Sequence, residues 1–170
     1  DLGVIRKNAW RVLRLVNQLM DFRKIDENKM LAQVSENDLI EFTKDIMQVF
    51  ERSAEKREID FNLFSREANL RVWFDKNMID KVLFNLLSNS FKFTPNRGRI
   101  HLSIEKDTSN SMSPFAKITI EDTGIGMSKE QVKHVFERFY QGGKYGIKGT
   151  GLGLSFSKEL VNLHKGSIDV

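Results

Sequence analysis

The sequence predicts an α+β protein: a two-layer sandwich with helices on one face of a mixed sheet, preceded by one long helix. Three helix-length segments place apolar residues at helical spacing, whereas four shorter segments alternate apolar and polar residues. The two kinds of segment occur in mixed order, with hairpin-like neighbours among the strands. That order favours a two-layer sandwich over a regular parallel array of β-α-β units.

Residues 1 to about 25 are predicted to form the long helix, because apolar residues recur there at heptad-like spacing. A single helix cannot bury such a face alone, so its partner lies elsewhere in the chain, in a second copy or in a segment outside this sequence. We place a domain boundary near Asp26, which separates residues 1–26 from residues 27–170. The stripe consists of Ile5, Val12, Leu15, Leu19 and Phe22, widened by Leu13, Val16 and Met20.

The second domain combines short strands and helices in mixed order. Asp38 and Glu41 have the spacing of a capping box at the start of a helix, and Pro95 with Gly98 ends the next long helix. Strands are expected at residues 31–35, 59–64, 70–74, 99–105 and 115–122, and a last strand, cut short by the end of the sequence, at 166–170. Helices are expected at residues 38–56, 76–93, 128–136 and 152–163. The core face of helix 38–56 is expected to contain Leu39, Phe42, Ile46, Val49 and Phe50.

The composition excludes several classes of site. The chain has 170 residues, of which 40% are hydrophobic and 29% charged, and it contains no cysteine. Disulfides, thiolate metal ligands and thiol nucleophiles are therefore excluded. The net charge of +4 is spread along the chain without a basic run, so we expect no direct binding to nucleic acid. The apolar runs are too short to cross a bilayer.

Polar residues line one side of the predicted helix 76–93. Asn85 and Asn89 lie four residues apart, and Lys92 follows three residues later on the same side. One interpretation is a solvated polar face. The other is a site for a metal ion and phosphates, because an amide carbonyl is a hard oxygen ligand for Mg²⁺ and a lysine adds a positive charge.

A first glycine cluster, EDTGIGM, occupies residues 121–127 at the end of a predicted strand. It is interpreted either as a tight turn or as one wall of a nucleotide site. In the second interpretation, the Asp122 carboxylate accepts a hydrogen bond from an exocyclic amine such as that of adenine. Gly124 and Gly126 then let the base approach the backbone.

A second glycine cluster, KGTGLGLS, occupies residues 148–155 and precedes a predicted helix. Because free N–H groups at a helix N-terminus attract phosphate, Gly149, Gly151 and Gly153 are candidate phosphate-binding residues. The cluster is not a Walker A loop, since no Gly-Lys pair is followed by Ser or Thr. It is not G-x-G-x-x-G either, since Leu154 occupies the third glycine position.

Four segments, taken together and in order, closely resemble the N, G1, F and G2 boxes of the catalytic domain of sensor histidine kinases, which belongs to the GHKL superfamily of ATP-binding folds. They are DKVLFNLLSNSFKFTP (80–95), EDTGIGM (121–127), FERFYQ (136–141) and GTGLGLS (149–155). The resemblance covers about residues 30–170. The leading helix resembles the second helix of the dimerisation and phosphotransfer hairpin, most like that of hybrid two-component sensors.

The resemblance implies a site for ATP and Mg²⁺. Asn89 would hold Mg²⁺, with Asn85 and Lys92 beside it near the phosphates as catalytic residues, and Phe93 would lie against the adenine. The other residues that the resemblance places at the nucleotide are Asp122, Gly124 and Gly126 at the adenine, Lys144 and Lys148 in the lid, and Gly149, Thr150, Gly151, Leu152 and Gly153 around the phosphates.

The F box of the resemblance implies the lid of the site. Phe136 and Phe139 would anchor the base of a lid at about residues 141–148. Many family members carry a basic residue at the position of Gln141. Lys144 or Lys148 would supply the γ-phosphate contact in its place.

The resemblance also implies the reaction. ATP-hydrolysing members carry a glutamate general base one turn before the metal-binding asparagine, whereas this chain has Asn85 there, an amide that cannot take a proton. We therefore expect poor hydrolysis and transfer of the γ-phosphate to a histidine ring, which is nucleophilic near neutral pH. His101, His134 and His164 lack the sequence context of the family's acceptor, so the chain is not expected to phosphorylate itself.

The partners implied by the resemblance are a histidine-bearing hairpin, a downstream response-regulator receiver domain and a second copy in a homodimer. The implied location is the cytoplasmic part of a membrane-anchored sensor. A GHKL-type ATPase and a degenerate nucleotide-binding scaffold are the alternatives. Asn85 argues against the ATPase, and Asn89 and Asp122 argue against the scaffold, for which Gln141 leaves room.

Overall fold

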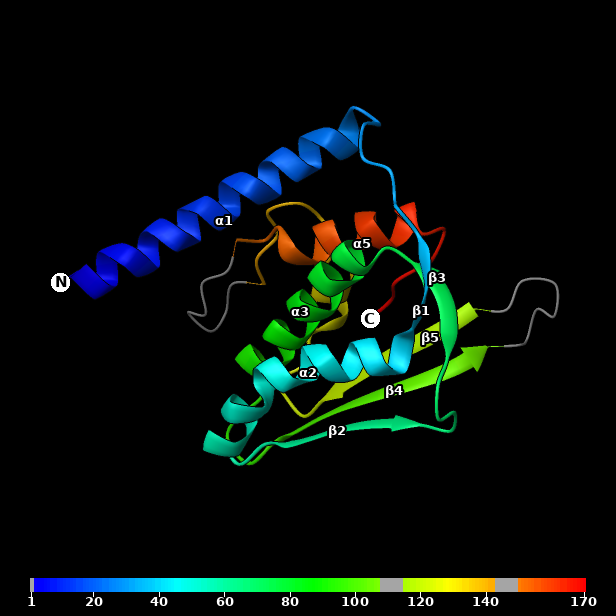
Figure 1. Cartoon of the computed structure of the whole chain (residues 1–170). Helices are drawn as coiled ribbons and strands as arrows, with labels where there is room; N and C mark the ends of the chain where they lie inside the picture. Colours follow the sequence, from blue (N-terminus) through cyan, green and yellow to red (C-terminus); the bar gives the residue numbers. More distant parts are fainter. Residues whose placement is uncertain (1, 108–114, 143–149) are drawn as a thin grey trace. The chain divides into compact units, whose positions relative to one another are not determined.

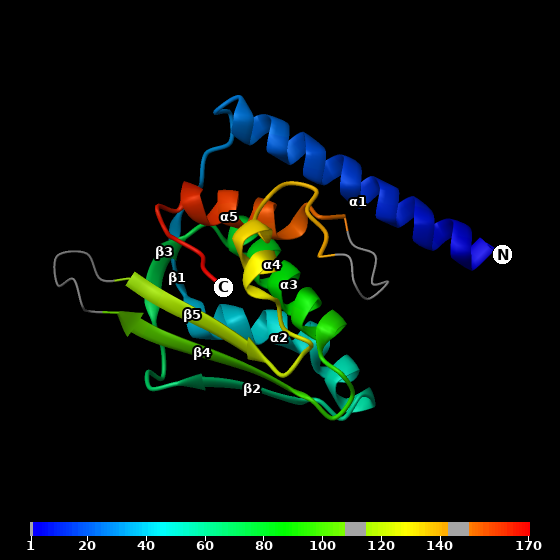
Figure 2. The same cartoon turned by 180° about the vertical axis from the view of Figure 1, so that it is seen from behind.

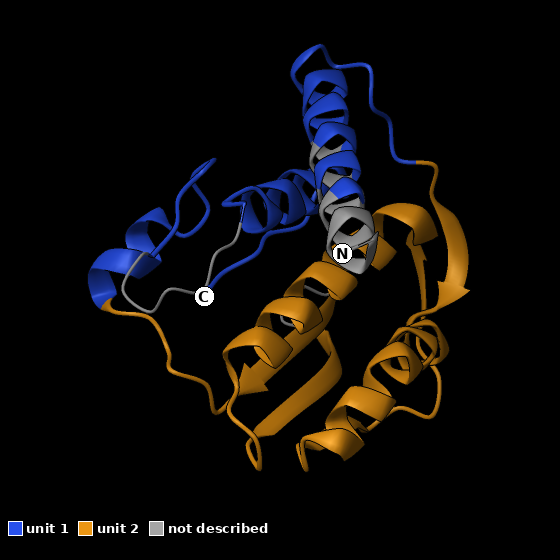
Figure 3. Cartoon of the chain, turned by 90° about the vertical axis from the view of Figure 1, so that its left-hand side faces the viewer, with its two compact units in different colours: residues 1–32, 129–170 blue, residues 33–128 orange. Residues whose placement is uncertain are grey.

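The computed structural model describes residues 2–107, 115–142 and 150–170, and within the first helix only some of the side chains. The chain divides into two compact units, one of residues 33–128 and one of residues 1–32 with 129–170 (Figure 3). Helices and mixed strands make up the chain (Figure 1), which confirms the predicted α+β class.

The strands described in the unit 33–128 form two ladders. In the larger ladder, β4 (Arg99–Asp107) lies between β2 (Asp60–Ser65), to which it is parallel, and β5 (Phe115–Asp122), to which it is antiparallel. In the smaller ladder, β1 (Ser35–Asp38) pairs antiparallel with β3 (Arg71–Phe74). The three-stranded sheet is mixed, as predicted, whereas β1 and β3 form a separate sheet.

Two long helices, α2 (Leu39–Lys56) and α3 (Lys76–Phe93), cover one face of the three-stranded sheet (Figures 1 and 2). The carboxylates of Asp38 and Asp75 cap their N-termini by accepting backbone N–H groups of the first turn. The buried residues shared by the helices and the sheet are Ile46, Met47, Phe50, Ala54, Ile59, Leu83, Leu87, Phe91, Ile100 and Leu102. This core packs α3, the helix that carries Asn85, Asn89 and Lys92, against the sheet.

Among its described residues, the other unit contains the helices α1 (Leu2–Asp26), α4 (Lys129–His134) and α5 (Gly153–Leu163). The last turns of α1 pack on α5 through Phe22, whose ring contacts that of Phe156 edge-on at 5.3 Å between centroids. The described apolar residues of the α1 stripe, other than Phe22, are exposed: Val12, Leu13, Val16, Leu19 and Met20. No helix in the described part of the chain is long and apolar enough to span a bilayer.

The strand expected at residues 31–35 is wrong by four residues, because β1 begins at Ser35. The backbone N–H of Gln33 donates to Asp75 Oδ2 at 2.8 Å. This N–H is therefore bonded to a side chain and not to the carbonyl of a neighbouring strand. Leu31 is 78% exposed, which shows that this apolar stretch is not a core strand.

Two further expectations are wrong. Val49 was expected in the core face of α2, but its side chain is 66% exposed, and Met47 is buried beside the expected Ile46 and Phe50. Residues 166–170 were expected to begin a strand, but they join none of the ladders in the described part of the chain. A strand exists only when a neighbour completes its hydrogen bonds.

Candidate functional site

The polar face predicted on α3 is present. Asn85 and Asn89 are half-buried and one helical turn apart, beside the fully buried Leu87 of the core stripe. Lys92 follows in the last turn and is exposed, and its Nζ lies 4.9 Å from the centre of the Phe93 ring. The helix therefore presents two amides and an ammonium along one side toward its C-terminus.

A tight turn follows α3. Thr94 is its C-cap and is extended, with ψ of 129°, as expected for a residue before proline. A Cβ at Gly98 would lie 2.4 Å from Thr94 Cγ2 and 2.9 Å from Pro95 O, so only glycine fits where the chain turns into β4. The Thr123 hydroxyl accepts the N–H of Arg99 at 2.9 Å, which fastens the end of β5 to the same turn.

The first glycine cluster meets the end of α3. The N–H of Gly124 donates to Asp122 Oδ1 at 2.9 Å, which orients a carboxylate that is exposed at the end of β5. A Cβ at Gly124 would lie 2.6 Å from that oxygen and 2.9 Å from the carbonyl oxygen of Phe93. The structure thus brings Phe93, Asp122 and Gly124 together, although Phe93 lies far from the other two in the sequence.

Position 126 favours glycine for a different reason. Its φ of 64° lies in the left-handed region, yet no atom of the described residues lies within 4 Å of the position of a Cβ. The backbone conformation, and not crowding, favours glycine there.

The second glycine cluster lies in the other unit and is built around Gly151. Its carbonyl accepts the N–H of Phe139 at 2.8 Å, and its φ is 68°. A Cβ there would lie 2.4 Å from the carbonyl carbon of Phe139, so a main-chain segment of the F box closes directly on this glycine. Phe139 itself has a φ of 65° and a side chain that is 62% exposed. The main chain of Phe139, and not its ring, therefore meets Gly151.

The start of α5 suits an anion. Leu152 is the N-cap, and α5 begins at Gly153 without a side-chain cap. The Thr150 hydroxyl accepts the N–H of Leu152 at 3.3 Å, and Leu152 is buried. N–H groups of an uncapped first turn bind phosphate well. Three predicted ligand-binding residues lie outside the described residues: Lys144, Lys148 and Gly149.

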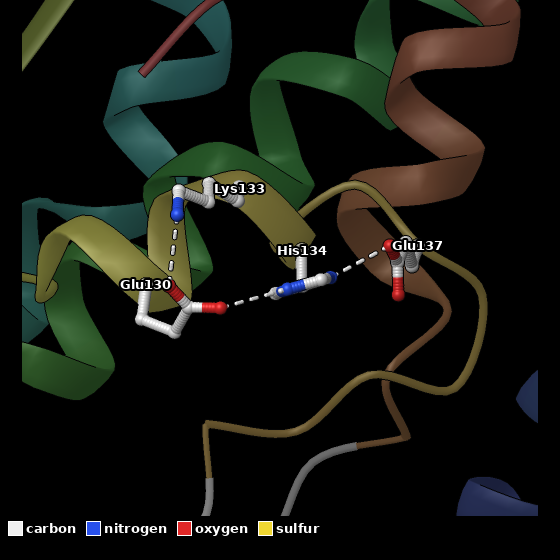
Figure 4. Close-up of polar contacts among 4 residues, drawn as sticks. All are labelled: Glu130, Lys133, His134 and Glu137. Atoms are coloured by element: carbon white, nitrogen blue, oxygen red, sulfur yellow. Dashed lines mark hydrogen bonds and ion pairs between the residues drawn. The ribbon is translucent and has the colours of Figure 1, made fainter.

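All three histidines have structural partners. His101 Nε2 contacts Asp60 Oδ2 at 2.9 Å, and His164 Nδ1 contacts the carbonyl oxygen of Leu160 at 2.7 Å. His134 lies between two carboxylates (Figure 4), with Nδ1 2.7 Å from Glu137 and Nε2 3.3 Å from Glu130.

The hydrogen bond to Glu137, and then that to Glu130, raise the pKa of His134 above its ordinary value. Each carboxylate accepts a hydrogen bond from one ring nitrogen. Only the protonated ring can donate from both nitrogens at once, so the two carboxylates together stabilise that form. In that form the ring has no lone pair with which to attack phosphorus, so the pair of carboxylates works against a role as phosphate acceptor.

Sequence reasoning missed Arg57. Its guanidinium donates to Asn96 Oδ1 at 3.0 Å and to the carbonyl oxygens of Phe91 and Thr94 at the end of α3. Two of these acceptors belong to the backbone, so no pairing of side chains in the sequence marks the contact. The only available signal was Pro95, which removes the N–H that would complete the last turn of the helix.

Comparison with known proteins identifies the family of the chain. Residues 74–170 match the family described as histidine kinase-, DNA gyrase B-, and HSP90-like ATPase. Histidine kinase P4 of Formosa agariphila is 35% identical over 98% of the chain, which spans 12% of that relative. Hybrid signal transduction histidine kinase D of Dictyostelium discoideum is 34% identical over 100% of the chain, which spans 11% of it.

Solved structures show the same fold. The catalytic domain of histidine kinase ThkA, in a nucleotide-free form, aligns with a TM-score of 0.66 and 26% identity over 76% of this chain and 80% of that one. ThkA in complex with the response regulator protein TrrA aligns with a TM-score of 0.69 and 23% identity over 92% of this chain and 42% of that one. The chain belongs to the histidine kinase-, DNA gyrase B- and HSP90-like ATPase family and contains the ATP-binding catalytic domain of a sensor histidine kinase.

Proposed function

We propose that this chain binds ATP with Mg²⁺ and transfers the γ-phosphate to a histidine on a separate hairpin. The observation that carries the proposal is the contact between the end of α3 and the first glycine cluster. A Cβ at Gly124 would lie 2.9 Å from the Phe93 carbonyl oxygen, and the Gly124 N–H orients the Asp122 carboxylate. The result is a fixed hydrogen-bond acceptor beside an aromatic residue, which suits an adenine base.

The adenine end of the site would work through Asp122 and Phe93. With Oδ1 held by the Gly124 N–H, the carboxylate keeps its direction and Oδ2 accepts the exocyclic amine. The half-buried Phe93 ring supplies an apolar surface for the base, and stacking on an aromatic ring is worth roughly 1–3 kcal/mol per base. Gly124 has no Cβ to block this approach.

The resemblance assigns the phosphates to residues on α3 and, in the other compact unit, to residues at the start of α5. Lys92 supplies a positive charge, and the N–H groups at the uncapped start of α5 supply hydrogen-bond donors. Asn89 would hold Mg²⁺. Its donor chemistry fits, because an amide oxygen is a hard ligand and Mg²⁺ takes few protein ligands besides phosphates and water. When bound, the metal neutralises charge on the phosphates.

Asn85 favours phosphoryl transfer over hydrolysis. An amide in the position one turn before Asn89 cannot remove a proton from water, whereas a neutral imidazole needs no base to attack phosphorus. The residues of this chain would then contribute position and charge, which are the main sources of catalysis in phosphoryl transfer. The contacts of the three histidines support an acceptor outside this chain.

We assign the chain to a longer sensor in which two copies pair through a helical bundle and the phosphate passes to a receiver domain. The exposed apolar stripe of α1 supports the pairing. The complex of ThkA with the response regulator protein TrrA supports the receiver partner. The membrane anchor and the cytoplasmic placement belong to the same assignment.

The test is a titration of the chain with a fluorescent ATP analogue, with and without Mg²⁺, alongside Asp122→Ala. Saturable binding that Mg²⁺ strengthens and that Asp122→Ala weakens at least tenfold is the expected result. Labelled ATP should then give acid-labile phosphohistidine on an added histidine-bearing hairpin and none on the chain itself. Binding with rapid hydrolysis instead would indicate the GHKL-type ATPase, and binding with neither reaction would indicate the scaffold.

A further inference from the structure

We propose that Arg57 is a positioning residue for the nucleotide site: its guanidinium holds the C-terminal end of α3, and with it Lys92 and Phe93, in the arrangement that receives ATP. The inference deepens the proposed function and rests on it. Arg57 is the C-cap of α2, a half-buried residue outside the four sequence boxes.

The guanidinium of Arg57 bridges α2 to the end of α3. Nη1 donates to the Phe91 carbonyl oxygen, Nη2 donates to the Thr94 carbonyl oxygen, and Nε donates to Asn96 Oδ1 at 3.0 Å. One planar group therefore satisfies three acceptors that enclose the last turn of α3 and the turn after it. Only arginine has a rigid fork of donors that can do this.

The sequence of α3 creates the need for this bridge. In a continuing helix, the Phe91 carbonyl would accept the N–H of residue 95, but Pro95 has none. Phe91 and Thr94 are 6% and 2% exposed, so water has little access there. A buried carbonyl without a donor is costly, and Arg57 supplies the donors from another helix.

Arg57 also places a positive charge where α3 ends. A helix C-terminus carries a partial negative charge, which works against the approach of a polyphosphate to neighbouring groups. A guanidinium bonded directly to two carbonyls of that terminus offsets this charge. The same contact therefore both holds the end of α3 in position and offsets its negative charge near the proposed phosphate-binding residues.

The residues between the two anchored carbonyls are Lys92 and Phe93, which the proposed function assigns to the phosphates and the adenine. The Phe93 carbonyl lies against Gly124, and Gly124 orients Asp122. A shift of the last turn of α3 would therefore reach the adenine acceptor as well. The carbonyl of Arg57 also accepts the N–H of Arg97 at 2.9 Å, which ties the turn to α2 a second time.

The test compares the whole chain with Arg57→Ala and Arg57→Lys, and uses Arg52→Ala on the exposed side of α2 as the control for loss of charge. Dissociation constants for a Mg²⁺-bound, non-hydrolysable ATP analogue are measured well below each unfolding midpoint. Hydrogen exchange at the Thr94 amide, which donates to Ser90 O at 2.9 Å, is measured without nucleotide. We expect Arg57→Ala to weaken nucleotide binding at least tenfold and to speed exchange at Thr94 at least tenfold.

Two measurements separate positioning from general loss of stability. Methylguanidinium at low millimolar concentration should restore at least a third of the lost affinity of Arg57→Ala and leave Arg52→Ala unchanged. Arg57→Lys, which keeps the charge but not the fork, should stay at least threefold weaker than the wild type. This variant also carries the test if Arg57→Ala does not fold.

Binding by Arg57→Ala within twofold of the wild type would overturn the proposal, and so would wild-type behaviour of Arg57→Lys. A wild-type chain that binds no nucleotide would overturn the proposed function instead. In that case faster exchange at Thr94 in Arg57→Ala would still identify the structural bridge, so the two failures are distinguishable.

Discussion

Asp26 and Arg138 form a two-point ion pair although 112 residues separate them in the chain. Arg138 Nη1 and Nη2 donate to the two carboxylate oxygens of Asp26 at 2.9 and 2.7 Å, and the guanidinium lies 4.4 Å from the centre of the Phe22 ring. The last turn of α1 is thereby joined to the segment that precedes Phe139 and the Gly151 contact. These links connect the end of the long helix to residues 136–141 within the same compact unit.

Arg138→Ala is expected to raise the pKa of Asp26 toward its ordinary value. The hydrogen bond from Arg138 holds that pKa below its ordinary value. A carboxyl with a depressed folded pKa stabilises the fold above its unfolded pKa, near 3.9, and loses that contribution as the pH falls through the folded value. The difference in unfolding midpoint between the wild type and Arg138→Ala should therefore shrink as the pH is lowered from 6 to 3.

The contact of Arg138 with Phe22 does not titrate, so the pH-dependent part of this difference isolates the ion pair. Carboxyl NMR should show the Asp26 pKa rising in Arg138→Ala and unchanged in Arg23→Ala, which removes a neighbouring arginine paired with Glu27. An Asp26 pKa that stays in place in Arg138→Ala would contradict the pair.

Gly124→Ala should damage nucleotide binding more than stability. The new Cβ would displace the Asp122 carboxylate, 2.6 Å away, or the Phe93 carbonyl, 2.9 Å away, and both lie at the proposed adenine site. We expect the dissociation constant of the ATP analogue to rise about tenfold, which corresponds to roughly 1.4 kcal/mol. Calorimetric titration measures it, with Gly166→Ala as the control, because the nearest atom there is a side-chain methyl at 3.1 Å. Equal affinities of the two variants would contradict the role of Gly124.

Gly126→Ala and Gly151→Ala form a matched pair for stability. Both glycines have a left-handed φ, 64° and 68°, but only Gly151 is crowded, by the backbone of Phe139 at 2.4 Å. Gly126→Ala should cost about 1–2 kcal/mol of the free energy of unfolding, the cost of a side chain in this conformation. Gly151→Ala should cost about 1–3 kcal/mol more, because main-chain atoms must move. Denaturant unfolding measures both free energies. Equal losses of stability would show that the Phe139 backbone moves aside without cost.

Much of the unit 33–128 was predictable because its signals are local. The capping aspartate Asp38 marks the start of α2, and the alternation in residues 99–105 and 115–122 marks β4 and β5. The exposed Leu31 shows where such signals fail, since its stretch looks apolar but the backbone N–H of Gln33 donates to Asp75. Whether such a stretch forms a strand is decided by the burial of its side chains and by its pairing with another strand, and both depend on distant residues.

The candidate site also has one part that local signals in the sequence predict and one part that they do not. Asn85 and Asn89 follow from helical spacing, which is set within one element. The contact of Gly124 with the Phe93 carbonyl and the bridge from Arg57 both end on backbone atoms about 30 residues away. Side-chain patterns carry no information about backbone acceptors, so the sequence indicates which residues are polar but not what holds them in place.

His134 should make the region of α4 sensitive to pH. Because its pKa is raised, mainly by Glu137 and then by Glu130, its stabilising effect is complete below the unfolded pKa near 6.5 and is lost as the pH rises through the folded value. Imidazole NMR should show the His134 pKa falling in Glu137→Gln and, by less, in Glu130→Gln. Glu51→Gln, an equal charge change on α2, should leave it unchanged. A His134 pKa that does not respond to Glu137→Gln would show that the two side chains do not pair in solution.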